Sequence, residues 1–110
     1  MPSWADISRK TGIATRRAYN LLAPMRDGTH LALDLIRPDA DAAYPVVLVR
    51  TPYDKTREHD KPFLHSLAER GYVVAIQDTR GRFNSDGSFF PYRDDRADGY
   101  DTVEWIAAQA

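Results

Sequence analysis

The chain has 110 residues, of which 43% are hydrophobic and 28% charged, with a formal net charge of −1 at pH 7. That length holds at most one domain, and the composition is that of an ordinary globular protein. The charge gives no general attraction to nucleic acid or to an anionic membrane. The absence of cysteine excludes disulfides, thiolate catalysis and cysteine-ligated metals.

Neither a membrane span nor a secretory signal is predicted. No run approaches the roughly 18 apolar residues that a span needs. The first 17 residues lack the apolar core of a signal peptide. We therefore expect a cytoplasmic protein.

Residues 1–18 are predicted to form a peripheral N-terminal extension, which is polar and irregular over 1–17. Its basic cluster favours a solvated tail or surface helix, and a phosphate-binding arm is the alternative. The cluster consists of Arg9, Lys10, Arg16 and Arg17.

A β-hairpin is predicted over residues 18–38. Asp27-Gly28 is a turn signal because glycine accepts positive φ. After it, Leu31, Leu33 and Leu35 alternate with the period of a half-buried strand, and His30 falls on the exposed face. Pro38 closes this second strand.

A strand, a helix and a second strand follow. Val46 to Val49 are four aliphatic residues in a row, which indicates a strand over 46–50 that is buried on both faces. The helix is predicted from about residue 60, with Pro62 in its first turn and Gly71 at its C-terminal cap. The next strand is predicted over 72–78, so the unit implies a parallel pair. The residues expected to face the core from the helix are Phe63, Leu64, Leu67 and Ala68.

A turn-rich loop and a last helix complete the chain. The loop contains Gly81 and Gly87, and the helix is predicted over 93–110. Because no cap, glycine or proline closes this helix, we expect the chain to be part of a longer protein. The residues expected to face the core from it are Tyr100, Val103, Ile106 and Ala107.

No complete nucleophilic machinery is recognisable. None of the five serines lies in a G-x-S-x-G motif, and no serine, histidine and acid suggest a triad. His59-Asp60 with His65 lacks the spacing of a metal site. Neither a dinucleotide-binding nor a P-loop glycine pattern follows a strand, so we expect no cofactor.

Two candidate features lie at the C-terminal ends of strands, where ligands bind in open α/β sheets. The first is Tyr53, delivered by a rigid Thr-Pro step. It is either a rim tyrosine that covers the sheet end or a hydroxyl that donates to an oxyanion, as a neutral phenol can. The second is Asp78 with Arg80, for which a hydrogen-bonded pair bracing the loop is favoured over a role for Asp78 as nucleophile or ligand.

Four segments, taken in order and spacing, resemble a known family. They are "PMRDGTHLALDLIRP", "VVLVRTPYDK", "LAERGYVVAIQDTRGRFNSDGSFFPYRDD" and "ADGYDTVEWIAAQ". Residues 19–110 are similar to the N-terminal part of the cocaine-esterase-like acyl hydrolases, which group with X-prolyl dipeptidyl peptidases and α-amino-acid ester hydrolases. Residues 1–18 carry none of the resemblance.

The resemblance implies an α/β-hydrolase fold, an incomplete part of it, with a Ser-His-Asp triad in the whole enzyme. It implies that the Tyr53 hydroxyl contributes to the oxyanion hole, and that Asp78, Arg80 and Gly81 form a supporting loop. In the family, the nucleophilic serine comes about a dozen residues past Ala110, and the acid and histidine follow later. The chain alone is therefore expected to be inactive.

The implied partners are the rest of the hydrolase chain and a small ester, amide or short peptide substrate. Strand 72–78 is expected between the hairpin and strand 46–50. That arrangement leaves the edge at Val46–Val49 unpaired, which is an aggregation hazard. Two alternatives remain: an X-prolyl dipeptidyl peptidase and, in another class, a non-catalytic α/β binding module. A flavodoxin-like domain is disfavoured by the antiparallel hairpin.

Overall fold

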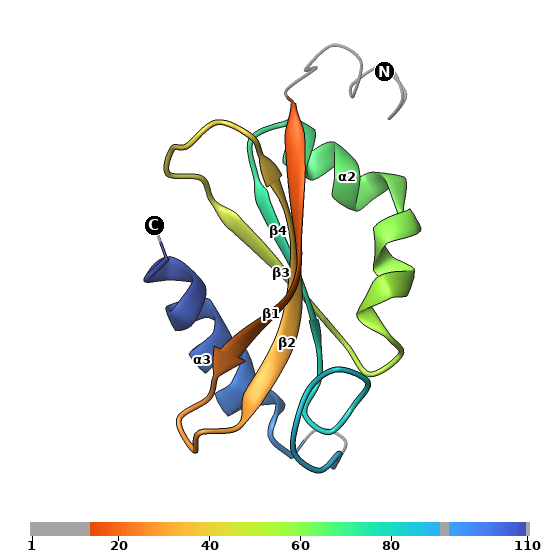
Figure 1. Cartoon of the computed structure of the whole chain (residues 1–110), viewed down its shortest axis with the longest axis vertical. Helices are drawn as coiled ribbons and strands as arrows, with labels where there is room; N and C mark the ends of the chain where they lie inside the picture. The colour runs from red at the N-terminus through yellow and green to blue at the C-terminus, as the bar shows by residue number, and fades with distance from the viewer. Residues whose placement is uncertain (1–13, 91–92, 110) are drawn as a thin grey trace.

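The computed structural model describes residues 14–90 and 93–109. A four-stranded mixed sheet lies between helices on its two faces (Figure 1). The elements are β1 (Thr15–Pro24), β2 (His30–Pro38), β3 (Val46–Thr51), the 3₁₀ helix η1 (Lys55–Asp60), α2 (Pro62–Glu69), β4 (Val73–Asp78) and α3 (Asp95–Ala107).

The strand order is β1-β2-β4-β3, so β4 lies between the hairpin and β3 as expected. β1 and β2 are antiparallel, β2 and β4 are antiparallel, and β3 and β4 are parallel. The parallel pair brings the C-terminal ends of β3 and β4 to one end of the sheet, where Thr51 is in register with Asp78. The predicted α/β fold class and hairpin are confirmed.

The sheet begins earlier in the chain than the sequence analysis expected. Thr15 to Ala18 pair with Pro38 to Leu35, so residues 15–17 are strand and not irregular. Arg16 and Arg17 therefore do not belong to a tail or a surface helix. Their exposed side chains reach Asp41 and His59. Arg9 and Lys10 lie outside the described residues.

β1 is interrupted by a β-bulge. Its register against β2 shifts between Ala18 and Leu21, and Asn20 has a φ of 55°. Asparagine is one of the few residues that adopt this left-handed conformation readily. The bulge turns the Asn20 backbone N–H toward the sheet, where it donates to Asp34 at 2.8 Å.

α2 begins and ends with the signals that the sequence shows. Pro62 occupies its first position, and Gly71 follows its last turn with a φ of 98°. The N–H groups of Gly71 and Tyr72 donate to the carbonyls of Ala68 and Leu67, which closes the helix in a Schellman motif. The chain then enters β4 directly.

The core consists of two clusters, one on each face of the sheet. The cluster under α2 contains Ile36, Leu64, Ala68, Val74 and Ile76. The cluster on the α3 side contains Ala23, Met25, Leu31 and Leu33, with Trp105 packed against them. Residues 32, 34 and 36 of β2 thus face α2, while residues 31, 33 and 35 face α3.

Three expectations about burial are wrong in part. Leu64 and Ala68 are buried in α2, but Phe63 is 49% exposed. β3 is half-buried along most of its length and not buried on both faces, because within the described residues it pairs on one side only. That open edge agrees with the expected strand order, and the aggregation hazard stays a prediction.

The third concerns α3, where Tyr100 is 61% exposed and Val103 is also exposed. Of the four residues expected to face the core, only Ile106 is buried. Asp98, Thr102 and Ile106 form the buried side. Polar groups of the sheet and of the loop after β4 bind Thr102 and Asp98, so the inner face of α3 is partly polar and is not the apolar stripe predicted from the sequence.

No helix among the described residues is long and apolar enough to cross a membrane.

Candidate functional site

Tyr53 lies just past the C-terminal end of β3, and its side chain is 70% exposed. Its backbone is held in place, because its N–H donates to Thr51 Oγ1 at 3.0 Å. The carbonyl of the preceding Pro52 accepts from Arg82 Nε at 3.0 Å. The following Asp54 has a φ of 82°, and its carboxylate accepts from the N–H and hydroxyl of Thr56. The loop therefore presents an exposed phenol on a constrained backbone.

A cavity of about 730 Å³ opens beside this phenol. Both strand ends contribute to it, together with the loop after β4 and the start of α3. The lining residues are Arg50, Pro52, Tyr53, Thr79, Arg82, Phe89 and Asp95. The structure thus brings the Tyr53 loop and the Asp78–Gly81 loop to the same cavity, as the parallel pair requires.

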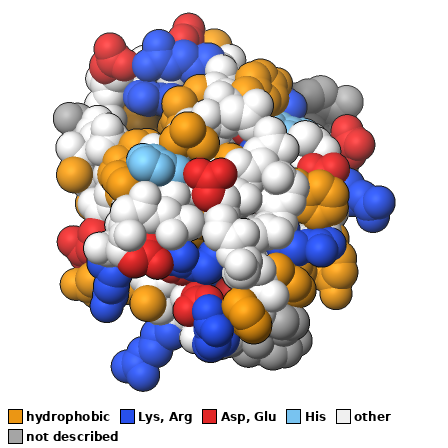
Figure 2. All heavy atoms as spheres, turned by 60° about the horizontal axis from the view of Figure 1, so that its bottom comes forward, with side chains coloured by type: hydrophobic (Ala, Val, Ile, Leu, Met, Phe, Trp, Pro, Cys, Tyr) orange, Lys and Arg blue, Asp and Glu red, His pale blue; other side chains and the backbone are white. Residues whose placement is uncertain are grey.

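This end of the molecule carries mixed charge. Figure 2 is turned so that this end comes forward, and it shows acidic and basic side chains interspersed with scattered hydrophobic ones. Within the cavity, the Arg50 guanidinium donates to Gln77 Oε1 at 2.8 Å and to Asp95 Oδ1 at 3.0 Å. The Arg82 guanidinium lies over the Phe83 and Phe89 rings, 5.2 and 5.1 Å from their centroids.

Asp78 braces the two loops with a buried carboxylate. Its Oδ1 accepts the Lys55 N–H at 2.8 Å, and its Oδ2 accepts the Asn84 N–H at 3.2 Å. Burial raises the pKa of this carboxyl above its ordinary value, against the effect of the two N–H groups. Both oxygens are occupied by backbone donors, which agrees with a supporting role.

Arg80 does not pair with Asp78, so that prediction is wrong. Its guanidinium donates to both oxygens of Asp98 on α3, at 2.8 and 2.9 Å. It also donates to Asp27 in the hairpin turn at 2.8 Å. Asp78 is the last residue of β4, whereas Arg80 lies in the turn that follows, where its side chain is directed toward α3 and the hairpin turn. These bonds raise the pKa of Arg80 and lower that of Asp27 to about 2.

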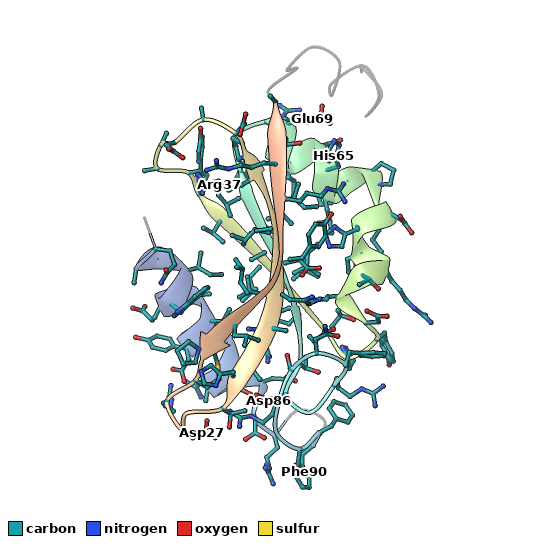
Figure 3. The ribbon with its side chains drawn as sticks, in the orientation of Figure 1. Asp27, Arg37, His65, Glu69, Asp86 and Phe90 are labelled. Atoms are coloured by element: carbon teal, nitrogen blue, oxygen red, sulfur yellow. The ribbon has the colours of Figure 1, made fainter. Side chains whose placement is uncertain are left out.

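Gly81 supports the same loop through its backbone. It has a φ of 74°, and a Cβ there would collide with the backbone of Ser88 and Phe89. Its N–H donates to the Asp86 carbonyl at 2.9 Å, and the Asp86 N–H donates to His30 at 2.9 Å. Figure 3 accordingly shows Asp27, Asp86 and Phe90 at one end of the molecule.

A buried polar cluster behind the Tyr53 loop was missed by the sequence analysis. Lys55 Nζ lies 3.1 Å from Asp34 Oδ1, with side chains 2% and 0% exposed. His59 Nε2 lies 2.7 Å from Asp34 Oδ2, and Asn20 Oδ1 accepts from Lys55 Nζ at 2.7 Å. One signal was visible in the sequence, because Asp34 is an acid in the middle of an apolar strand. Its partners come from residues 14 and more positions away, which periodicity does not reveal.

This histidine and acid do not make a catalytic pair. Arg17 Nη1 lies 3.0 Å from His59 Nδ1, and an arginine only donates hydrogen bonds. Nδ1 is therefore the acceptor, and Nε2 carries the proton that it donates to Asp34. With both ring nitrogens engaged, His59 has none left to take a proton from a nucleophile.

The other histidines lie elsewhere. His30 is exposed on the hairpin as expected, and His65 pairs with Glu69 at 2.8 Å along α2 (Figure 3). Ser85 is buried, where its hydroxyl donates to the Asp78 carbonyl and accepts the Ala32 N–H. Within the described residues, no group of three or more His, Asp or Glu side chains could hold a metal ion.

A mixed sheet of this strand order, covered by helices on both faces and open at the C-terminal ends of its parallel strands, defines the first part of an α/β-hydrolase fold. The family profile described as X-Pro dipeptidyl-peptidase (S15 family) matches residues 27–110. The chain therefore belongs to this hydrolase family.

Curated and solved relatives agree with this assignment. The chain is 51% identical over 98 residues to the cocaine esterase of Rhodococcus sp. (strain MB1 Bresler), and the match covers 84% of the chain and 17% of that enzyme. It superposes on an α-amino acid ester hydrolase with a TM-score of 0.73 and 27% identity, over 86% of the chain and 19% of that structure. A CocE/NonD family hydrolase from Staphylococcus aureus gives a TM-score of 0.71 and 26% identity, over 84% and 20%. The chain thus spans about a fifth or less of the length of these relatives.

Proposed function

We propose that this chain is the first part of the catalytic domain of a serine hydrolase, which cleaves ester or amide bonds through an acyl-enzyme. In this proposal, the Tyr53 hydroxyl donates a hydrogen bond to the oxyanion of the tetrahedral intermediate. The nucleophilic serine, its histidine and its acid are supplied by the rest of the hydrolase chain.

The observation that supports this proposal is the presentation of Tyr53. Its phenol is exposed beside a cavity of about 730 Å³, while Thr51 and Arg82 hold the backbone on which it stands. An oxyanion donor acts well when it is preorganised, since no reorganisation is then needed as charge develops. A rim tyrosine that merely covered the sheet end would be expected to pack its ring against the strands.

Ester substrates are favoured over peptides. The curated relative at 51% identity is a cocaine esterase, and the solved relative at 27% identity is an ester hydrolase. The family description favours the alternative, an X-Pro dipeptidyl-peptidase. Hydrolysis rates for a matched pair of substrates, an aryl ester and an X-Pro anilide, discriminate between the two.

The chain by itself is proposed to be inactive. Ser85 has both hydroxyl roles engaged in the structure, and both ring nitrogens of His59 are engaged as well. Neither group is free to start an acyl transfer. Ester turnover by the purified 110-residue chain would contradict this part of the proposal.

The test is Tyr53→Phe in the complete protein that carries this chain. We expect kcat to fall about 10²- to 10³-fold, as for the loss of one oxyanion donor, with little change in KM. Tyr72→Phe is the matched control, because Tyr72 is an exposed tyrosine that precedes β4 at the opposite end of the sheet. Equal kcat values for the two variants would refute the role of Tyr53.

A further inference from the structure

We infer that Lys55 and Asp34 are positioning residues for Tyr53, and that their buried ion pair fixes the loop that carries the phenol. The inference rests on the proposed function, since it requires the Tyr53 hydroxyl to touch the reacting group. Neither residue lies among those that line the cavity.

The ion pair is buried, and both of its side chains make further hydrogen bonds. Lys55 Nζ contacts Asp34 Oδ1 at 3.1 Å and donates to Asn20 Oδ1 at 2.7 Å. Asp34 accepts the Asn20 N–H on Oδ1 at 2.8 Å and His59 Nε2 on Oδ2 at 2.7 Å. The cluster thereby connects the β1 bulge, the middle of β2 and η1.

Stability is a poor explanation for this pair. Removing two charges from water is costly, and apolar residues of similar volume are often as stabilising as a buried ion pair. A buried ion pair differs from an apolar contact in its directional geometry. Here that geometry ties Lys55 to one point on the sheet.

Lys55 transmits this constraint to Tyr53, two residues earlier in the chain. Its N–H donates to the buried carboxylate of Asp78 at 2.8 Å, while its side chain is held by Asp34. On the other side, the Tyr53 N–H is bound to Thr51, which pairs with β4. The segment 52–54 is thus anchored at both ends, and the positive φ of Asp54 is maintained by these anchors.

Asn20 extends the same cluster to the loop after β4. Its side-chain oxygen accepts from both Lys55 Nζ and Asn84 Nδ2, at 2.7 and 3.0 Å. Asn84 in turn donates its N–H to Asp78. Both loops that border the cavity are therefore hydrogen-bonded to the same buried cluster, next to the bulge of β1.

The first measurement is Lys55→Met in the complete protein. Misplacement of a catalytic group by about 1 Å can cost on the order of 10²-fold, so we expect kcat to fall between about 10- and 100-fold with KM nearly unchanged. Lys61→Met is the matched control, because Lys61 is an exposed lysine that follows η1 and pairs with Glu58. An unchanged kcat for Lys55→Met would overturn the inference.

Lys55→Met leaves the Asp34 carboxylate without its cation, so a second variant separates positioning from stability. Lys55→Met/Asp34→Leu removes both charges and is expected to regain part of the Tm that Lys55→Met loses, while kcat stays low. The recovery is partial because the Asn20 N–H and His59 Nε2 then lack their acceptor. Recovery of kcat together with Tm would overturn the inference, because the pair would then act through stability alone.

A readout that does not depend on activity is amide hydrogen exchange of peptides covering residues 51–55. We expect faster exchange in Lys55→Met/Asp34→Leu and no change in Lys61→Met. Unchanged exchange in the double variant would overturn the inference. If the parent protein hydrolysed neither esters nor amides, the proposed function would fail, and the exchange would still decide whether the pair holds the loop.

Discussion

The two faces of the sheet contact their helices through different kinds of side chain. On one face, α2 packs through Leu64 and Ala68 onto Ile36, Val74 and Ile76, which are all apolar and buried. On the other face, polar side chains make much of the contact between α3 and the rest of the chain. The two helices lie on opposite sides of the same four strands (Figure 1).

The polar contacts of α3 come in pairs. Arg80 binds Asp98, and Gln77 Nε2 donates to Thr102 Oγ1 at 2.9 Å inside the interface. At the hairpin turn, Arg26 makes a bidentate contact with Asp101, with bonds of 2.8 and 2.9 Å. Each of these hydrogen-bonded pairs forms at only one position of the helix over the sheet. These pairs therefore hold α3 at a defined position next to the cavity.

The largest effect is expected from breaking the polar face. Arg80→Met leaves the Asp98 carboxylate buried without its main partner, which costs about 3–5 kcal/mol for a buried pair. Arg50 Nη2 is 4.0 Å from the same carboxylate, so the lower end of that range is expected. The free energy of unfolding from urea denaturation measures this effect.

The matched variant is Arg80→Met/Asp98→Leu, which removes both charges. It should recover most of the lost free energy of unfolding, because the burial cost disappears with the charge. If the single and the double variant were equally unstable, the specific charge pair would not be what docks α3.

A smaller effect is expected on the apolar face. Leu64→Ala should lower the free energy of unfolding by about 2–3 kcal/mol, through lost burial and the cavity left behind. Phe63→Ala, at the neighbouring half-exposed position, should cost clearly less. Equal losses in the same denaturation experiment would show that the inner face of α2 is wrongly assigned.

The smallest effect is a dependence on acid pH at the hairpin turn. Bonds to Arg80 lower the pKa of Asp27 from 3.8 to about 2, and Arg26 lowers that of Asp101. A carboxyl with a lowered pKa in the folded state stabilises fully above its unfolded pKa, and the contribution is lost as the pH falls toward the folded value. The Tm difference between the parent protein and Asp27→Asn should therefore shrink between pH 4 and pH 2. Because Asp27 is largely exposed, the shift is expected to be small, and a constant difference would contradict it.

The elements that build the apolar face were predictable from the sequence. Continuous aliphatic runs in β3 and β4, the proline at the start of α2 and the glycine after it are local signals, and they predicted the parallel unit. The order β1-β2-β4-β3 followed from these elements and the family resemblance. Phe63 was wrongly expected to be buried, because the four residues predicted to face the core span more of the helix surface than the sheet covers.

The polar face and the cluster behind Tyr53 were not predictable in this way. Arg80 meets Asp98 and Asp27 across 18 and 53 residues, and Lys55 meets Asn20 across 35. A sequence pattern predicts that a charged residue is exposed unless its partner is known. The inner face of α3 was wrongly expected at Tyr100 and Val103 for this reason.

By itself, the sequence determined most of the strands and helices, though not the start of β1 at Thr15 or the 3₁₀ helix η1. It also determined the antiparallel hairpin followed by a parallel pair, and the place of Tyr53 at a strand end. These properties depend on neighbours a few residues apart, through period, turn chemistry and capping. Only the tertiary structure decided which charges are buried together and how they hold the Tyr53 loop, because the burial of a charge depends on partners that the fold brings from distant positions.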